Sequence, residues 1–180
     1  PPWLNWPVSI SSRRARASSG MAVSTQGRPR PRQVVAYWPA LMRRDGVKAK
    51  ILTPRTQQPL SRAFVREDAL SLFQSGHVLL FAGGTGNPYF TTDSAAALRA
   101  LEIGADVLVK GTQVDGVYDK DPKKHADAKR YDRVTYDEVL QKHLGVMDAS
   151  AIALARDNSL PIIVFSLEEP GGFRGILAGE

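Results

Sequence analysis

Two apolar segments of this chain are joined by the stretch Gly83-Gly84-Thr85-Gly86-Asn87-Pro88-Tyr89-Phe90-Thr91-Thr92-Asp93. Residues 77–82 (HVLLFA) before it have the composition of a buried strand, and the alanine-rich residues 94–103 after it predict a helix. A strand that leads through glycines into a helix aims backbone N–H groups at one point, which favours an anion such as phosphate. Asp93 or Thr92 is expected to cap the helix. The order predicts an α/β fold with a ligand-binding loop, although a simple strand-to-helix turn would also use glycine.

A second buried strand is predicted over residues 107–109 (VLV), because a continuous apolar run is typical of a parallel strand covered on both faces. Lys110 is expected at the C-terminal end of this strand, where open α/β sheets bind their ligands. It would neutralise phosphate charge there, or it is a solvated surface lysine. The residues alone leave both interpretations open.

The remaining elements follow from periodicity, turn residues and capping residues. We expect helices over 38–45 and 63–74, strands over 47–52 and 160–165, a turn at Asp115-Gly116, a capping box at 135–138, a helix from Asp148 through Ala155, and a turn at 171–172 before an apolar stub at 175–178.

Residues 81–102, FAGGTGNPYFTTDSAAALRALE, resemble the uridylate-binding loop of bacterial-type UMP kinases, which belong to the amino-acid kinase superfamily. The similarity spans about residues 45–180 and is strongest from Val78 onward. Several motifs in one order make it specific. They lie at 104–118, 121–122, 130–132, 135–140, 146–148, 155–158, 160–162 and 164–165.

The resemblance implies a three-layer α/β/α sandwich with a mainly parallel sheet, the amino-acid kinase fold. It implies transfer of the γ-phosphoryl of ATP to UMP with Mg²⁺, which gives UDP and ADP in pyrimidine nucleotide synthesis. It also implies a homo-oligomer, usually a hexamer regulated by nucleotides. The expected partners are therefore UMP, ATP and further copies of the chain.

The resemblance also assigns roles to individual residues. Asp93 matches a carboxylate near the transferring phosphate. Beside it we name Lys110 as catalytic for the charge that it would offset, a role that comes from its place after the buried strand and not from the resemblance. Positions that contact ATP match Thr112, Tyr118 and Asp121. The loop that holds UMP matches Thr85, Gly86, Asn87, Pro88, Tyr89, Phe90, Thr91 and Thr92.

The chain also departs from the family pattern. It contains no K-x-S-G-E strand, whose lysine and glycine meet the ATP phosphates, and no G-G-G-N loop followed by arginine. We therefore expect a fold that is incomplete at the N-terminus and lacks the last strand, and a kinase impaired by these losses. The alternatives are a non-catalytic nucleotide-binding fragment or another enzyme of the amino-acid kinase family. The string NPYFTTD argues against the second.

Charge divides the chain into an arm and a body. Residues 1–44 hold eight arginines and no lysine or acidic residue, which leaves 16 basic and 18 acidic residues, a net charge of −2, for 45–180. Residues 1–39, rich in proline, serine and arginine, are expected to be irregular, and 40–180 to form the nucleotide-binding domain. The arm is a transit peptide, a binder of anionic polymers or non-native sequence from a shifted reading frame. We favour the last.

Several functional classes lack support in the sequence. No apolar run is long enough to span a bilayer, there is no cysteine, and the near-neutral body has no nucleic-acid signature. His77, His125 and His143 lack the spacing of metal ligands, so we assign no metal to the chain and expect Mg²⁺ to arrive with the nucleotide. A cytoplasmic location is expected, and organellar import only if the arm is a genuine transit peptide.

Overall fold

The structure is a computed structural model that describes residues 42, 44–56 and 61–179. Predictions for residues 1–39, and most of the helix predicted over 38–45, lie outside the described residues. The chain forms two compact units that meet in sequence between Gly104 and Ala105. We call them the N-terminal and the C-terminal unit, and each is described by itself.

The N-terminal unit is built on a parallel sheet of order β2-β1-β3. Strand β1 spans Ala49–Thr53, β2 spans Arg62–Ala63 and β3 spans Val78–Phe81. The register places Ile51 opposite Leu80, so the carboxyl ends of β1 and β3 lie at one edge of the sheet. The strands predicted over 47–52 and 77–82 are thereby confirmed, with ends shifted by one or two residues.

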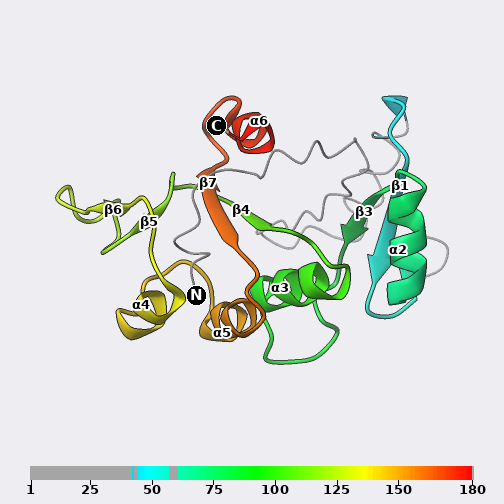
Figure 1. Ribbon diagram of the computed structural model, residues 1–180, viewed down its shortest axis with the longest axis horizontal. Coiled ribbons are helices and arrows are strands. Elements are labelled where there is room, and N and C mark those ends of the chain that lie inside the picture. Colours follow the sequence, from blue (N-terminus) through cyan, green and yellow to red (C-terminus); the bar gives the residue numbers. More distant parts are fainter. Residues whose placement is uncertain (1–41, 43, 57–60, 180) are drawn as a thin grey trace. The chain divides into compact units, whose positions relative to one another are not determined.

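Helix α2 (Arg66–Gln74) packs against β3 (Figure 1). Its predicted start at residue 63 is wrong, because Arg62–Ala63 are taken up by parallel pairing with β1. The buried core beneath it consists of Leu52, Ala69 and Leu79. Phe64 and Phe81 pack against this core edge to face, with ring centroids 5.7 Å apart.

Helix α3 (Thr92–Glu102) follows β3 and is anchored to the start of α2. The guanidinium of Arg99 lies 4.0 Å from the centroid of the Phe64 ring and pairs with the Glu102 carboxylate. Arg66 Nε donates to the Glu102 carbonyl at 2.6 Å. These contacts tie the C-terminal end of α3 to the residues at the start of α2.

The C-terminal unit contains two separate strand pairs. Strands β4 (Leu108–Thr112) and β7 (Ile162–Ser166) pair in parallel, and β5 (Val117–Tyr118) and β6 (Arg130–Tyr131) form an antiparallel hairpin. Figure 1 shows the hairpin extending away from the β4–β7 pair. Three of the four described strand pairings are parallel, and helices lie between the strands in sequence, which confirms the predicted α/β class.

Three helices complete the C-terminal unit: α4 (Tyr136–Gln141), α5 (Ala149–Asp157) and α6 (Gly172–Ala178). The apolar stub predicted at 175–178 belongs to α6, whose Phe173 ring packs 5.9 Å from that of Phe165 on β7. Asp148 caps α5 as predicted, with its Oδ1 accepting from the backbone N–H of Ala151 at 2.9 Å. None of the described helices is long and apolar enough to cross a membrane.

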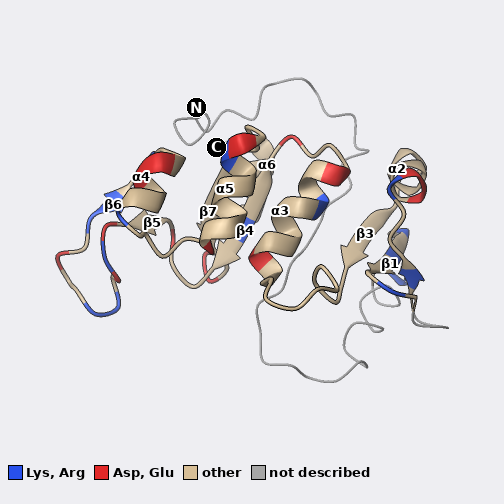
Figure 2. Ribbon diagram, turned by 90° about the horizontal axis from the view of Figure 1, so that it is seen from below, with Lys and Arg blue, Asp and Glu red and all other residues tan. Residues whose placement is uncertain are grey.

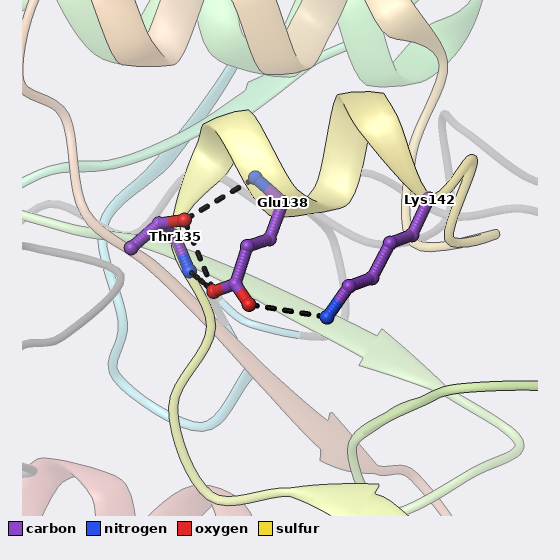
Figure 3. A network of polar contacts seen from close by, with 3 residues as sticks. All are labelled: Thr135, Glu138 and Lys142. Atoms are coloured by element: carbon purple, nitrogen blue, oxygen red, sulfur yellow. Dashed lines mark hydrogen bonds and ion pairs between the residues drawn. The ribbon is translucent and has the colours of Figure 1, made fainter.

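The predicted capping box is present at the start of α4 (Figure 3). The Thr135 hydroxyl accepts from the Glu138 N–H at 3.2 Å, and the Glu138 carboxylate accepts from the Thr135 N–H at 3.3 Å. One turn later Lys142 Nζ donates to Glu138 Oε1 at 3.1 Å. Lys142 also lies 5.4 Å from the Tyr131 ring centroid, which links α4 to the hairpin.

Replacing the capping hydroxyl tests this network. We expect Thr135→Ala to lower the free energy of unfolding by about 1 kcal/mol, because the Glu138 N–H of a short helix loses its acceptor and the Glu138 carboxylate loses the Thr135 hydroxyl. Urea unfolding followed by circular dichroism measures the change. Ser150→Ala, at an exposed position of α5, is the control and should have little effect. Equal stability of the two variants would contradict the capping role.

Candidate functional site

The glycine-rich loop runs from the carboxyl end of β3 to the N-terminus of α3 in the N-terminal unit. Gly83, Gly84 and Gly86 adopt positive φ angles of 86°, 65° and 80°, as the sequence leads one to expect of glycine. Tyr89 also has a positive φ, of 68°, and its side chain is fully exposed. A non-glycine residue in this conformation is strained, a feature that clusters at ligand sites.

Pro54, which directly follows β1, presses against this loop. A Cβ atom at Gly86 would lie 2.5 Å from Pro54 Cβ, and one at Gly83 would lie 3.2 Å from Pro54 Cδ. The N–H of Ala82 also donates to the Leu52 carbonyl at 3.0 Å. The loop is therefore held at the shared carboxyl edge of β1 and β3, the edge where α/β sheets bind ligands.

Thr91, rather than Asp93 or Thr92, caps α3. The Thr91 hydroxyl accepts from the backbone N–H groups of Asp93 at 3.1 Å and of Ser94 at 3.3 Å. The prediction was wrong by one residue because three adjacent residues all have side-chain oxygens suited to capping, and the backbone conformation decides among them. Asp93 is then the second helical residue and stands in the first turn.

The side chains of the loop are largely available at its surface. The Thr85 hydroxyl accepts from the Asn87 N–H at 3.1 Å and so closes a local turn. Phe90 is 56% exposed, and Asn87 and Thr92 are exposed. Hydroxyl, amide and aromatic groups thus surround glycines at a helix N-terminus, a set that can bind a phosphorylated ring compound.

The predicted residues of the C-terminal unit lie on β4 and on the hairpin. Lys110 is not at the end of its strand: β4 runs on to Thr112, and Lys110 is its third residue, paired with Val164. The strand is longer than the apolar run that predicted it, because pairing with β7 recruits polar residues. Thr112 is therefore the residue at the carboxyl end, and its hydroxyl accepts from the Val114 N–H at 3.2 Å.

Tyr118 and Asp121 are both tied into the hairpin. The Tyr118 hydroxyl donates to Asp115 Oδ1 at 2.6 Å, and Arg130 Nη1 donates to Asp115 Oδ2 at 2.8 Å. Asp121 Oδ1 accepts from the Lys123 N–H at 3.0 Å. Figure 2 shows basic and acidic residues alternating around this loop.

These hydrogen bonds shift the pKa values of Asp115 and Tyr118 in opposite directions. The Tyr118 hydroxyl, followed by the backbone and Arg130, lowers the pKa of the Asp115 carboxyl below its ordinary value of 3.8. The same bond raises the pKa of the Tyr118 phenol. Asp115 and Arg130 were missed as possible site residues, since Asp115-Gly116 was interpreted only as a turn. An acidic residue three positions before a tyrosine in a tight turn was the available signal.

The structure therefore gathers the predicted residues into two groups. Thr85–Thr92 and Asp93 belong to the N-terminal unit, and Lys110, Thr112, Tyr118 and Asp121 belong to the C-terminal unit. Among the described residues there is no cluster of three or more histidine, cysteine, aspartate or glutamate side chains that would hold a metal ion.

Comparisons with known proteins agree on one family. The sequence pattern of the amino acid kinase family matches residues 20–166. The chain is 63% identical over 135 residues to a uridylate kinase of Roseobacter denitrificans, covering 75% of this chain and 56% of the relative. For a uridylate kinase of Xanthomonas oryzae the identity is 53%, with 75% and 56% covered. The chain thus spans about half the length of these curated relatives.

Solved structures show the same likeness. A UMP kinase structure from Bacillus anthracis matches with a TM-score of 0.78 at 33% identity, covering 82% of this chain and 61% of that one. One from Ureaplasma parvum also has a TM-score of 0.78, at 32% identity, covering 82% and 63%. The predicted amino-acid kinase fold, an α/β sandwich, is confirmed.

The contact between Pro54 and the loop can be tested at two glycines. Gly84→Ala should cost about 1 kcal/mol of unfolding free energy, because only the positive φ opposes a side chain there. Gly86→Ala should cost about 3 kcal/mol, since the new methyl group also overlaps Pro54. Urea unfolding of both variants measures the difference, and equal losses would show that Pro54 does not confine the loop.

The Asp115 network predicts a pH dependence. A carboxyl whose pKa is lowered in the folded state contributes stability above its unfolded pKa and loses it as the pH falls through the folded value. The stability difference between the unaltered chain and Asp115→Asn should therefore be full at pH 6 and shrink below about pH 4. Unfolding experiments at several pH values measure it. A constant difference down to pH 3 would contradict the lowered pKa.

Proposed function

Because the chain belongs to the amino acid kinase family, we propose that it is part of a UMP kinase, which transfers the γ-phosphoryl group of ATP to UMP and yields UDP and ADP. The observation that carries the proposal is the loop from Gly83 to Asp93, held by Pro54 at the carboxyl edge of β1 and β3. The match to the family pattern, over residues 20–166, includes this loop.

The uridylate would bind at Thr85–Thr92. The glycines keep the backbone close to the ligand, because a side chain at Gly86 has no room beside Pro54. The Thr91 hydroxyl fixes the first turn of α3, and the exposed Asn87 and Thr92 side chains are available to the ligand beside it. An anionic phosphate is also favoured at the N-terminus of an eleven-residue helix.

The second substrate, ATP, would contact Thr112, Tyr118 and Asp121. Phosphoryl transfer depends mainly on positioning and charge neutralisation, and the acceptor phosphate of UMP is already anionic, so a general base has little to do. Asp93 would orient the reacting groups, and Lys110 would offset their charge. Mg²⁺, when bound with the nucleotide, supplies further charge neutralisation; Asp93 and Asp121 are oxygen donors of the kind this ion accepts.

One alternative remains a non-catalytic nucleotide-binding protein. The specific observation behind it is that the sequence contains no K-x-S-G-E motif, so the described site has no lysine from that strand for the ATP phosphates. Such a chain would bind UMP without turning it over. Another amino acid kinase, acting on a carboxylate or carbamate, would instead accept a different substrate.

The remaining properties belong to the same proposal. We infer a cytoplasmic protein that forms a homo-oligomer, a hexamer by its resemblance to the family, and that responds to nucleotides. Its partners would be UMP, ATP and copies of itself. Light scattering of the purified chain, with and without nucleotides, measures the oligomeric state.

The central test is release of ADP from ATP and Mg²⁺ with UMP, CMP or no acceptor. We expect UMP-dependent turnover, and we expect Asp93→Asn to lower kcat roughly 100-fold while calorimetry shows unchanged UMP binding, because the carboxylate acts on the reacting groups. Asp106→Asn, at an exposed turn, is the matched control. UMP binding without turnover by the unaltered chain would favour the non-catalytic alternative, and absence of both would reject the proposal.

A further inference from the structure

Asp115 uses both of its carboxylate oxygens inside the β5–β6 hairpin. One accepts from the Tyr118 hydroxyl at 2.6 Å and the other from Arg130 Nη1 at 2.8 Å. Arg130 Nη2 lies 3.8 Å from Asp132 Oδ1, so the guanidinium is itself held from two sides. Charge-assisted bonds of this length are stronger than neutral ones and define the direction of both side chains.

The pairing of the strands brings these groups together. The hairpin has only two paired positions, Val117 with Tyr131 and Tyr118 with Arg130. Tyr118 and Arg130 are thus directly opposite, and Asp115 bridges them from the turn. So short a hairpin is marginally stable by itself, which gives the side-chain bridge a larger share in its order.

Gly116 makes room for this bridge. A Cβ atom at Gly116 would lie 3.0 Å from Arg130 Cδ and 3.2 Å from Arg130 Cγ. The aliphatic part of Arg130 therefore lies across the turn, and its guanidinium reaches Asp115 from a defined direction. On the other strand, the Tyr131 ring is covered by Lys142 of α4, 5.4 Å from its centroid.

The consequence concerns the Tyr118 ring. Its hydroxyl donates its single proton to Asp115 and has none left for a ligand. The ring orientation is fixed before any ligand arrives, so the entropy of ordering this side chain is not lost on binding. What the ring offers is its face, which suits a flat aromatic base rather than a phosphate.

We propose that Asp115 and Arg130 are positioning residues that hold the Tyr118 ring ready for the base of ATP. This inference rests on the proposed function, in which Tyr118 contacts ATP. Asp115 does not touch the nucleotide: it acts through Tyr118, and Arg130 acts through Asp115. The face of the Tyr118 ring then contacts the base of ATP, and the Tyr118 hydroxyl only fixes the ring through its bond to Asp115.

A purely structural role for Asp115 would have a different signature. If Asp115 only stabilised the hairpin, its loss would weaken all triphosphates alike, because the whole site would loosen. A positioning role through the ring weakens the binding of ATP and spares inorganic tripolyphosphate, which has no base. Asp115 and Tyr118 can also be tested for coupling, because a substitution at either residue removes the hydrogen bond that holds the Tyr118 ring.

The experiment is calorimetry with the full chain, ATP and inorganic tripolyphosphate. We expect Asp115→Ala and Tyr118→Phe each to weaken ATP binding about fivefold, and the double variant to bind ATP as well as either single variant. The affinity for tripolyphosphate should not change in any of them. Tyr118→Leu should be weaker than Tyr118→Phe, since the ring face is lost. Asp127→Ala is the matched control: it removes a carboxylate from the same loop, paired with Lys120 at 2.6 Å, and should leave ATP binding unchanged.

Three results would overturn the inference. Unchanged ATP binding by Asp115→Ala would show that the bond between Asp115 and the Tyr118 hydroxyl does not affect ATP. Equal weakening of ATP and tripolyphosphate binding would show that Asp115 has only a general structural role. Additive losses in the double variant would show that Asp115 and Tyr118 act separately. If the unaltered chain bound no ATP, both this inference and the proposed ATP site would be rejected. That result is distinct from the three above, because it is obtained with the unaltered chain and not with a variant.

Discussion

The parallel pairing of β1 with β3 is the constraint on which the candidate uridylate site depends. It brings the residues that follow both strands to one edge, so that Pro54 from one connection and Gly86 from the other compete for the same space. Both connections fit only because Gly86 has no side chain, since a Cβ atom there would overlap Pro54. The loop is then narrow and close to the sheet, and its polar side chains turn outward at the start of α3.

In the C-terminal unit, order comes from side chains as much as from strands. The β5–β6 hairpin has two paired positions, yet carboxylates in its loop accept hydrogen bonds from backbone N–H groups and from a lysine side chain. Asp119, for example, accepts from the Lys129 N–H at 2.8 Å through its side chain. Because these polar groups are paired within the hairpin, two of the proposed ATP contacts, Tyr118 and Asp121, lie on a segment whose shape its own side chains help to define.

The errors of the sequence interpretation have a common cause. The helix expected from residue 63 begins at Arg66, and the strand expected to end at Lys110 continues to Thr112, because in both cases pairing with a strand distant in sequence overrides local composition. The cap of α3 moved to Thr91 for a more local reason, the backbone conformation of one residue. In contrast, the capping box of α4 and the Asp148 cap were predicted correctly, since each is complete within four residues.

The sequence by itself determined the α/β class, the strand–loop–helix order around Gly83 to Asp93 and the likeness to uridylate kinases, because these are properties of contiguous residues. Only the tertiary structure decided that Pro54 makes Gly86 indispensable and that Asp115 and Arg130 hold Tyr118. Pro54 and Gly86 are 32 positions apart and Asp115 and Arg130 are 15 apart, and nothing in local composition predicts that these pairs will meet. Strand pairing and the turns beside it set those distances, and they thereby decide which polar groups each side chain still has available for a ligand.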